Sequence, residues 1–235
     1  DILLDITALS NRGLLGALDC AVESGRQILI GYSEAGEYWP KETDWKKLKK
    51  ELFDNKSIAE IVDKKPWLFG HEHHIQLIPG YEGYDSAGCG RALIAFLPFK
   101  CARLNAVLNQ EDYSEFLFIA GRPRLYENRW RLAAQKKINE PITKTFNIKT
   151  MSTFSYRNTF RQLSAILLKD DSLFYKYNIH LAILGSKLQT VGCWALCNIL
   201  KSITVVTSIP EKYYPEGFSE GIGTSWVFRL TSPRV

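Results

Sequence analysis

The sequence lacks any hydrophobic run near the roughly 20 residues that a membrane-spanning helix needs, so we expect no transmembrane segment. We also expect no signal peptide, because the first residues, DILLDIT, have the pattern of a strand. Cysteine is scarce. The five cysteines, an odd number without regular spacing, exclude a disulfide scaffold and favour a reducing, cytoplasmic compartment. The chain begins without methionine, and we expect residues before Asp1 to be missing.

Most enzyme motifs are absent as well. There is no GxGxxG after the first strand and no GxxxxGK[ST], which excludes the usual dinucleotide and P-loop sites. There is no GxSxG, HExxH or CxxC. The HEHH segment, with His71, His73 and His74, has no further ligand motif downstream, and Cys193 and Cys197 lack a second pair. We therefore expect neither a metal nor a cofactor, and we interpret the two cysteines as buried apolar residues.

The net charge of +5 is concentrated in one segment. Between Arg122 and Lys137, six basic residues stand against Glu127, which gives six minus one, or +5, so the rest of the chain sums to zero. This pattern predicts a local basic patch that can bind a polyanion. The lysine run Lys46–Lys50 has acidic neighbours and is interpreted as a solvated helix face. The patch consists of Arg122, Arg124, Arg129, Arg131, Lys136 and Lys137.

Apolar runs alternate with helical patterns along most of the chain, which is typical of an α/β protein. We predict one Rossmann-like domain over 1–235, with a mostly parallel open sheet, helices on both faces and a helical insertion at about 37–70. One sheet should hold at least five strands and include Ile2–Ile6 and Ile28–Ile30, while Trp226–Leu230 should lie at an edge. The other predicted strands are Ile75–Pro79, Ala92–Leu97, Glu115–Ala120, Asn147–Met151, Ile179–Leu184 and Ser202–Thr207.

Ligands of open parallel sheets bind beyond the carboxyl ends of the strands. Here the residues that follow the strands are rich in hydroxyls and cations and poor in carboxylates, which suits a phosphate-bearing ligand better than a metal. The candidate binding residues are Ser10, Arg12, Arg122, Arg124, Gly185, Ser186, Lys187 and Gln189.

The sharpest local pattern lies in Asn178–Ile199, where an apolar run, the turn Gly185-Ser186-Lys187 and a helical pattern follow one another. The first N–H groups of a helix have no internal partner, and the helix dipole favours an anion there. Lys187, expected to be exposed, would add a charge. Gly185 would be required by a positive φ or by a close approach of the ligand. The alternative is a capped turn in which Ser186 only satisfies the start of the helix.

The turn, read as Gly185-Ser186-Lys187-x-Gln189-Thr190-x-Gly192, resembles the G-[ST]-K-x-x-[ST] turn of CRISPR-associated Rossmann-fold (CARF-like) sensor domains and of related nucleotide-sensing modules of anti-phage systems. The segments Val205–Tyr214 and Ser219–Trp226 (in FSEGIGTSW) are similar to uncharacterised prokaryotic proteins with the same turn. The resemblance covers about a quarter of the chain. It implies a pocket for cyclic or linear oligonucleotides at the turn, and a homodimer. Leu184 departs from a glycine that the family often has.

Three hypotheses follow. The first is a nucleotide- or nucleic-acid-sensing subunit of a prokaryotic defence or regulatory assembly, with phosphate on the turn and Arg122 and Arg124 nearby. Because no effector nuclease is recognisable, its output would come from a partner subunit or a missing N-terminal part. The second is an enzyme acting on a nucleotide, phosphoester or nucleic acid, with Asp5 or Glu34 as the acid/base. Asp5 is otherwise interpreted as a buried structural acid. The third is a scaffold subunit whose turn binds nothing.

Overall fold

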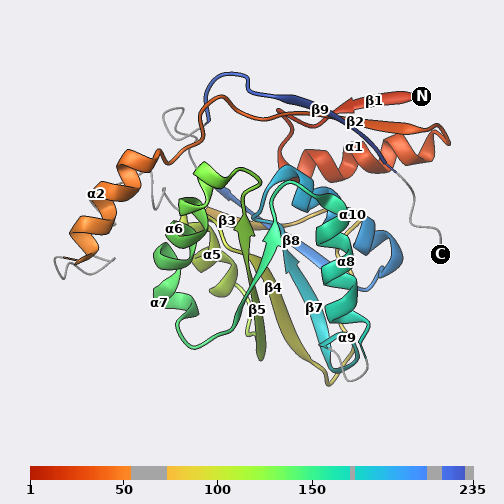
Figure 1. Cartoon of the computed structure of the whole chain (residues 1–235). Coiled ribbons are helices and arrows are strands. Elements are labelled where there is room, and N and C mark those ends of the chain that lie inside the picture. The colour runs from red at the N-terminus through yellow and green to blue at the C-terminus, as the bar shows by residue number, and fades with distance from the viewer. Residues whose placement is uncertain (54–72, 170–172, 211–218, 231–235) are drawn as a thin grey trace.

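The computed structural model describes residues 1–53, 73–169, 173–210 and 219–230, and these form two sheets (Figure 1). The larger sheet has six strands in the order β3-β8-β7-β4-β5-β6. Five of them run parallel, and β3 pairs antiparallel with β8 at one edge. The mostly parallel α/β sheet is thus confirmed. Its strands are β3 (His73–Leu77), β4 (Gly90–Phe96), β5 (Glu115–Arg122), β6 (Ile148–Ser152), β7 (Tyr177–Ala182) and β8 (Thr204–Pro210).

Helices cover both faces of the large sheet, as predicted (Figure 1). Strand β4 shows why: its side chains from Ala92 to Phe96 are all buried, and successive side chains point to opposite faces of the sheet. Leu93 packs in a core with Leu104, on the side of α5 (Cys101–Leu108), α6 (Trp130–Ile138) and α7 (Glu140–Thr143). Ile94 packs in a second core with Leu163 and Leu196, on the side of α8 (Tyr156–Leu167) and α10 (Lys187–Ile199). The short helix α9 (Leu173–Lys176) leads into β7.

The first two predicted strands do not belong to the large sheet, so that part of the prediction is wrong. β1 (Ile2–Asp5) and β2 (Ile28–Ser33) pair in parallel, and β9 (Ser225–Arg229) joins β2 antiparallel, as a separate three-stranded sheet. The reason is visible in β1, whose residues alternate between half-buried and exposed, with Leu3 62% exposed. A strand buried on one face only suits the edge of a small sheet. β9 lies at an edge, as predicted.

The small sheet is fixed to the large one through α1 (Asn11–Glu23). Ser10 caps this helix by accepting a hydrogen bond from the Gly13 amide at 3.0 Å, as its sequence position predicts. Asp19 accepts hydrogen bonds from the Tyr81 hydroxyl at 2.7 Å and from Trp194 Nε1, on α10, at 2.8 Å. Since α1 and α10 share one core, the two sheets form a continuous packed body.

Of the predicted insertion, the structure describes residues 37–53, which include one helix, α2 (Glu42–Phe53). The remainder of that prediction, with His71, lies outside the described residues, as does the side chain of His73. Among the described residues no group of three or more His, Cys, Asp or Glu side chains is arranged to hold a metal ion. Within the same ranges, none of the helices has the length and apolar character that crossing a membrane requires.

Candidate functional site

The Gly185–Lys187 turn lies at the point where the order of the large sheet reverses. From β4 the chain proceeds outward through β5 to β6, and it then returns to β7 on the other side of β4 and continues to β8. β7 and β4 are therefore neighbours whose following helices, α10 and α5, cover opposite faces. Such a switch point is where open α/β sheets bind ligands. The turn that the sequence singled out directly follows one of its two strands.

Within the turn, Ser186 acts as the N-cap of α10. Its Oγ accepts from the Gln189 amide at 3.2 Å and donates to the Thr153 carbonyl at 2.6 Å. Gln189 Oε1 in turn accepts from the Ser186 amide at 2.9 Å, which completes a capping box. The Ser186 hydroxyl is thus fully engaged by the fold, in agreement with the capping interpretation of this residue.

Gly185 is required by packing. Its φ lies outside the left-handed region, so the predicted conformational reason does not apply. A Cβ at this position would lie 2.4 Å from Gln189 Oε1 and 3.1 Å from the Phe96 ring at the end of β4. The absent side chain lets the Gln189 amide lie directly against the turn.

Gln189 carries an unsatisfied donor at the start of α10. The residue is 2% exposed, and its Nε2 is buried with no hydrogen-bond partner among the described residues. A buried donor without a partner costs about 1–3 kcal/mol, and native proteins contain few of them. This atom lies on the side chain that closes the capping box, so it belongs to the predicted turn.

Lys187 is half-buried, which contradicts the expectation of an exposed side chain. Its ammonium donates a hydrogen bond to the Leu9 carbonyl, in the segment that leads from β1 into α1. Burial lowers the pKa of Lys187, and the nearby charge of Arg103 lowers it further. Asn11 Nδ2 donates to the Ile183 carbonyl at 2.8 Å, so the start of α1 lies beside the turn.

Ser10 and Arg12 lie on either side of Asn11, and neither makes a hydrogen bond to the turn among the described residues. Ser10 is used as the cap of α1, and Arg12 Nη1 donates to Gln76 Oε1, on β3, at 2.8 Å. The structure therefore brings both residues to the neighbourhood of Lys187 through Leu9 and leaves them engaged elsewhere.

Arg122 and Arg124, both predicted to bind phosphate, have different surroundings. Arg122 is exposed at the end of β5, and its side chain has no ion pair or hydrogen bond among the described residues. Its carbonyl accepts from the Thr153 amide at 3.0 Å, and Thr153 is also the acceptor of Ser186 Oγ. Arg122, Thr153 and Ser186 thus form a row along the carboxyl edge of the sheet.

Arg124, in contrast, joins the two sheets. Its Nη2 lies 2.9 Å from Glu34 Oε2, and its guanidinium lies 4.9 Å from the Phe154 ring centroid and 5.0 Å from that of Trp226. Trp226 Nε1 also donates to Glu34, at 3.0 Å. Glu34 is therefore engaged by two neighbours. Asp5, expected to be buried, is exposed, and hydrogen bonds from Thr7 lower its pKa.

The basic segment of the sequence does not form a single patch. Arg131 is largely buried and donates hydrogen bonds to the carbonyls of Tyr38, Trp39 and Pro40. Burial lowers its pKa to about 10. Lys137 is engaged in an ion pair with Glu140. Because the sequence shows charge but not burial, it could not separate these structural cations from exposed ones.

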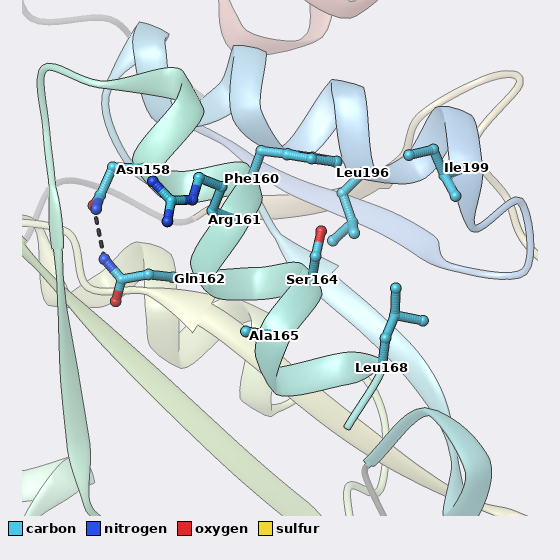
Figure 2. Close-up of a pocket in the computed structure, with 9 residues that line it drawn as sticks. All are labelled: Asn158, Phe160, Arg161, Gln162, Ser164, Ala165, Leu168, Leu196 and Ile199. Atoms are coloured by element: carbon cyan, nitrogen blue, oxygen red, sulfur yellow. Dashed lines mark hydrogen bonds between the residues drawn. The ribbon is translucent and has the colours of Figure 1, made fainter. Parts of the chain in front are cut away.

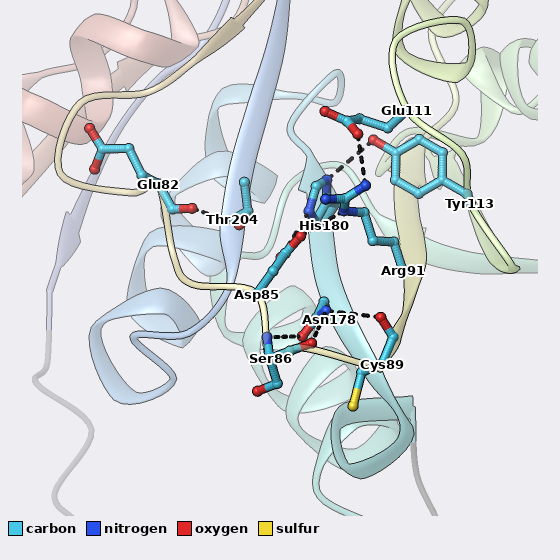
Figure 3. Close-up of polar contacts among 10 residues, drawn as sticks. All are labelled: Glu82, Asp85, Ser86, Cys89, Arg91, Glu111, Tyr113, Asn178, His180 and Thr204. Carbon is cyan, nitrogen blue, oxygen red and sulfur yellow. Dashed lines mark hydrogen bonds and ion pairs between the residues drawn. The ribbon is translucent and has the colours of Figure 1, made fainter.

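A second polar cluster, which sequence reasoning missed, lies at the opposite, amino edge of the sheet (Figure 3). His180 is 5% exposed, with Nε2 3.4 Å from Asp85 Oδ1 and Nδ1 3.3 Å from the Tyr113 hydroxyl. Arg91 bridges Asp85 at 2.6 Å and Glu111 at 2.9 Å. Each of the five side chains has a partner inside the cluster. The signal in the sequence was His180 itself, a polar residue within the apolar strand NIHLAIL.

A hollow of about 620 Å³ lies on the outer side of α8 and the end of α10 (Figure 2). Its lining is mainly apolar, with Phe160, Leu168 and Ile199 among its residues. The two lining amides, Asn158 and Gln162, bond to each other at 2.7 Å. Ser164 also lines the hollow, and its Oγ is buried without a hydrogen-bond partner among the described residues, so the mainly apolar hollow offers one unpaired polar atom.

Comparisons with known proteins identify no family: no family model matches the chain, and a search of curated proteins finds no match.

Proposed function

We propose that the protein is a binding module for a phosphate-bearing ligand, a nucleotide or oligonucleotide, held at the Gly185–Lys187 turn. The observation that carries this proposal is the buried Nε2 of Gln189, which has no partner in the described part of the chain and lies in the first turn of α10, at the switch point of the sheet. A phosphate oxygen is a suitable acceptor for this donor, since the helix dipole favours an anion at the same place.

The charges around the turn agree with an anionic ligand. Lys187 is half-buried, and the effect of Arg103 on its pKa indicates a second cation close by. A phosphate would replace the Leu9 carbonyl as the partner of the Lys187 ammonium, and Arg122 would contribute from the neighbouring strand end. Two predicted ligands are less suited to this role, because Ser186 and Arg124 are already engaged by the fold.

The finer assignment rests on the resemblance of the turn to CRISPR-associated Rossmann-fold sensor domains. We propose on this basis a sensing subunit of a prokaryotic defence or regulatory assembly, which passes its signal to a partner subunit and pairs as a homodimer. Two residues of that motif, glycine and lysine, have physical roles here: Gly185 admits the Gln189 amide, and Lys187 supplies the charge.

The proposal is tested by Gln189→Glu. This change keeps the acceptor that bonds the Ser186 amide and replaces the unsatisfied donor with a negative oxygen, so the capping box survives while an anion is repelled. Binding of mononucleotides and of linear and cyclic oligonucleotides is measured by titration calorimetry and thermal shift. A ligand at about 100 times its Kd adds about 2.7 kcal/mol to the stability of the parent. In the variant, affinity should fall at least about tenfold, the worth of a hydrogen bond to a charged group.

Two further variants make the test specific. Lys187→Gln removes the charge without altering the cap and should also lower affinity at least about tenfold. Gln162→Glu on α8 makes the same chemical change away from the turn and should leave binding unchanged. A parent protein that binds no member of the panel would refute the proposal in favour of a scaffold, and turnover of any member with Mg²⁺ would favour the enzyme.

A further inference from the structure

An exposed aromatic ring and an arginine form a pair near the carboxyl end of β5. Tyr126 is 77% exposed, and the Arg129 guanidinium carbon lies 4.6 Å from the centroid of its ring. The pair follows β5 directly, four residues beyond Arg122 in the case of Tyr126. Both side chains therefore belong to the edge of the sheet that carries the candidate turn.

The backbone explains why these two side chains meet. Residues Tyr126–Asn128 form a 3₁₀ turn (η1) that leads into α6. Side chains three residues apart eclipse one another in a 3₁₀ helix, so Arg129 lies over Tyr126. The Arg129 amide donates to the Tyr126 carbonyl at 3.0 Å, which fixes the spacing. The pair is thus held by the main chain and needs no support from other side chains.

The fold gains little from this pair, and this distinguishes it from the other arginine–aromatic contacts of the molecule. Arg124 also packs on rings, but it is ion-paired with Glu34 and its two rings are partly buried. Arg129 has no ion pair among the described residues, and the Tyr126 ring buries only a minor part of its surface. An aromatic ring backed by a cation and open to solvent is the arrangement on which proteins stack the bases of single strands.

We propose that Tyr126 and Arg129 form a base-stacking site, separate from the Gly185–Lys187 turn, for an unpaired nucleobase of a single-stranded nucleic acid. Arg122, exposed and unpaired among the described residues, precedes Tyr126 by four residues, and its carbonyl is linked to the turn through Thr153, which bonds both Arg122 and Ser186. Arg122 would contact the intervening phosphate. This inference rests on the proposed function, because the turn supplies the anchoring phosphate contact. A membrane is a poorer occupant, since it would require a cluster of exposed apolar side chains.

The test compares a short single-stranded DNA, the same strand with abasic sites, and a mononucleotide, each titrated into the parent and Tyr126→Ala. We expect the parent to bind the intact strand about tenfold more tightly than the abasic strand, and Tyr126→Ala to lose this preference, since stacking of one base on an aromatic side chain accounts for a change of that size. Mononucleotide binding should be equal in both proteins. Tyr126→Phe should retain the preference, and Tyr84→Ala, which removes another exposed tyrosine (66%), should have no effect.

The outcomes separate the two proposals. If the parent binds the mononucleotide and the strands, but Tyr126→Ala still prefers the intact strand, the stacking site is refuted and the anion site at the turn stands. If the abasic and intact strands bind the parent equally, the partner is a plain polyanion such as an acidic peptide, and the stacking site is again refuted. If the parent binds none of the three probes, the proposed function fails and this inference fails with it.

Discussion

The two ends of the large sheet carry polar groups that are arranged in opposite ways. At the amino edge, His180, Asp85 and Arg91 belong to a cluster in which every side chain has a partner (Figure 3). At the carboxyl edge, Gln189 keeps a buried donor without a partner among the described residues, and Arg122 has no ion pair there. Both ends contain buried polar atoms, but within the described part of the chain it is the carboxyl edge that leaves one of them, Gln189 Nε2, unmatched.

This difference separates a stabilising role from a binding role. The amino-edge cluster attaches the loop before β4 to the sheet, with support from Asn178, which bonds the Ser86 amide at 2.7 Å. Because each side chain of this cluster has a partner inside it, the loss of one member should reduce stability. A donor left unmatched at a helix start reduces stability by itself, and a ligand that satisfies it gains the difference. Mutations at the two edges should therefore separate stability from binding.

The largest effect is expected for His180→Ala. The change leaves a cavity in the sheet and removes one of the partners of Asp85 and the ring nitrogen that contacts the Tyr113 hydroxyl, which together should lower the unfolding free energy by about 2–4 kcal/mol. Urea denaturation at neutral pH measures this loss. Asp112→Ala changes an exposed residue in the loop that carries Glu111 and Tyr113, and its unfolding free energy should stay within about 0.5 kcal/mol of the parent. A folded His180→Ala protein that no longer binds phosphate ligands would show that the amino edge is itself a binding site.

Gly185→Ala is the corresponding change at the carboxyl edge. The added Cβ would lie 2.4 Å from Gln189 Oε1, and overpacking of this kind costs about 1–3 kcal/mol. Because it also displaces the unsatisfied amide, it should weaken binding of the anion as well. Gly16→Ala in α1 is the control: its Cβ meets nothing within 4 Å, so helix propensity should raise stability by about 0.5–1 kcal/mol. If both alanine variants behaved alike, the packing argument for Gly185 would be wrong.

Acid should weaken the amino edge first. Burial lowers the pKa of His180, so the folded protein resists a proton that the unfolded chain accepts near its ordinary pKa of 6.5. Stability is therefore full above about pH 6.5 and falls as the pH drops through the window below it, by at most about 1.4 kcal/mol per unit for this one group. His180→Gln should flatten that slope in urea denaturation measured from pH 7.5 to 5. An unchanged slope would assign the acid sensitivity to other groups.

A second acid window belongs to Asp85. Burial alone would raise the pKa of this carboxyl, but the hydrogen bond from Arg91 and the contact with His180 outweigh it, so the pKa is lowered. The stability that this group contributes is present above its unfolded pKa of 3.8 and is lost as the pH falls below that value. In Asp85→Asn, the unfolding free energy should therefore depend less on pH below about pH 4, while its slope near pH 6, which belongs to His180, should remain.

The smallest effects separate Arg122 from Arg124. Arg124→Gln removes an ion pair with Glu34 and contacts with two rings, and should lower stability by about 1 kcal/mol. Arg122→Gln removes an exposed side chain and should change stability by less than about 0.5 kcal/mol while lowering affinity for the phosphate ligand. Denaturation and titration of the two variants measure both quantities. Equal losses of affinity would mean that Arg124 leaves its aromatic contacts to bind ligand.

Much of the fold was predictable because it depends on local patterns. Ser186 was considered as a possible cap from its type and position, and it accepts the expected backbone hydrogen bond; Ser10, of the same residue type before a helix, does so as well. The strands β4, β5, β7 and β8 were predicted from apolar runs, since a parallel strand buried on two faces carries few polar residues. The roles of Arg124, Arg131 and His180 were not predictable, because a sequence does not show which partner a charged side chain meets.

The sequence by itself determined the alternation of strands and helices and the start of α10, because both follow from local periodicity and capping. It also placed a glycine, a lysine and a glutamine close together at that helix start. The tertiary structure alone decided that β1 and β2 form a separate sheet, that Lys187 bonds Leu9 and that the Gln189 amide is buried without a partner among the described residues. These outcomes depend on contacts between residues far apart in the chain. Burial and hydrogen-bond satisfaction exist only once such contacts have formed.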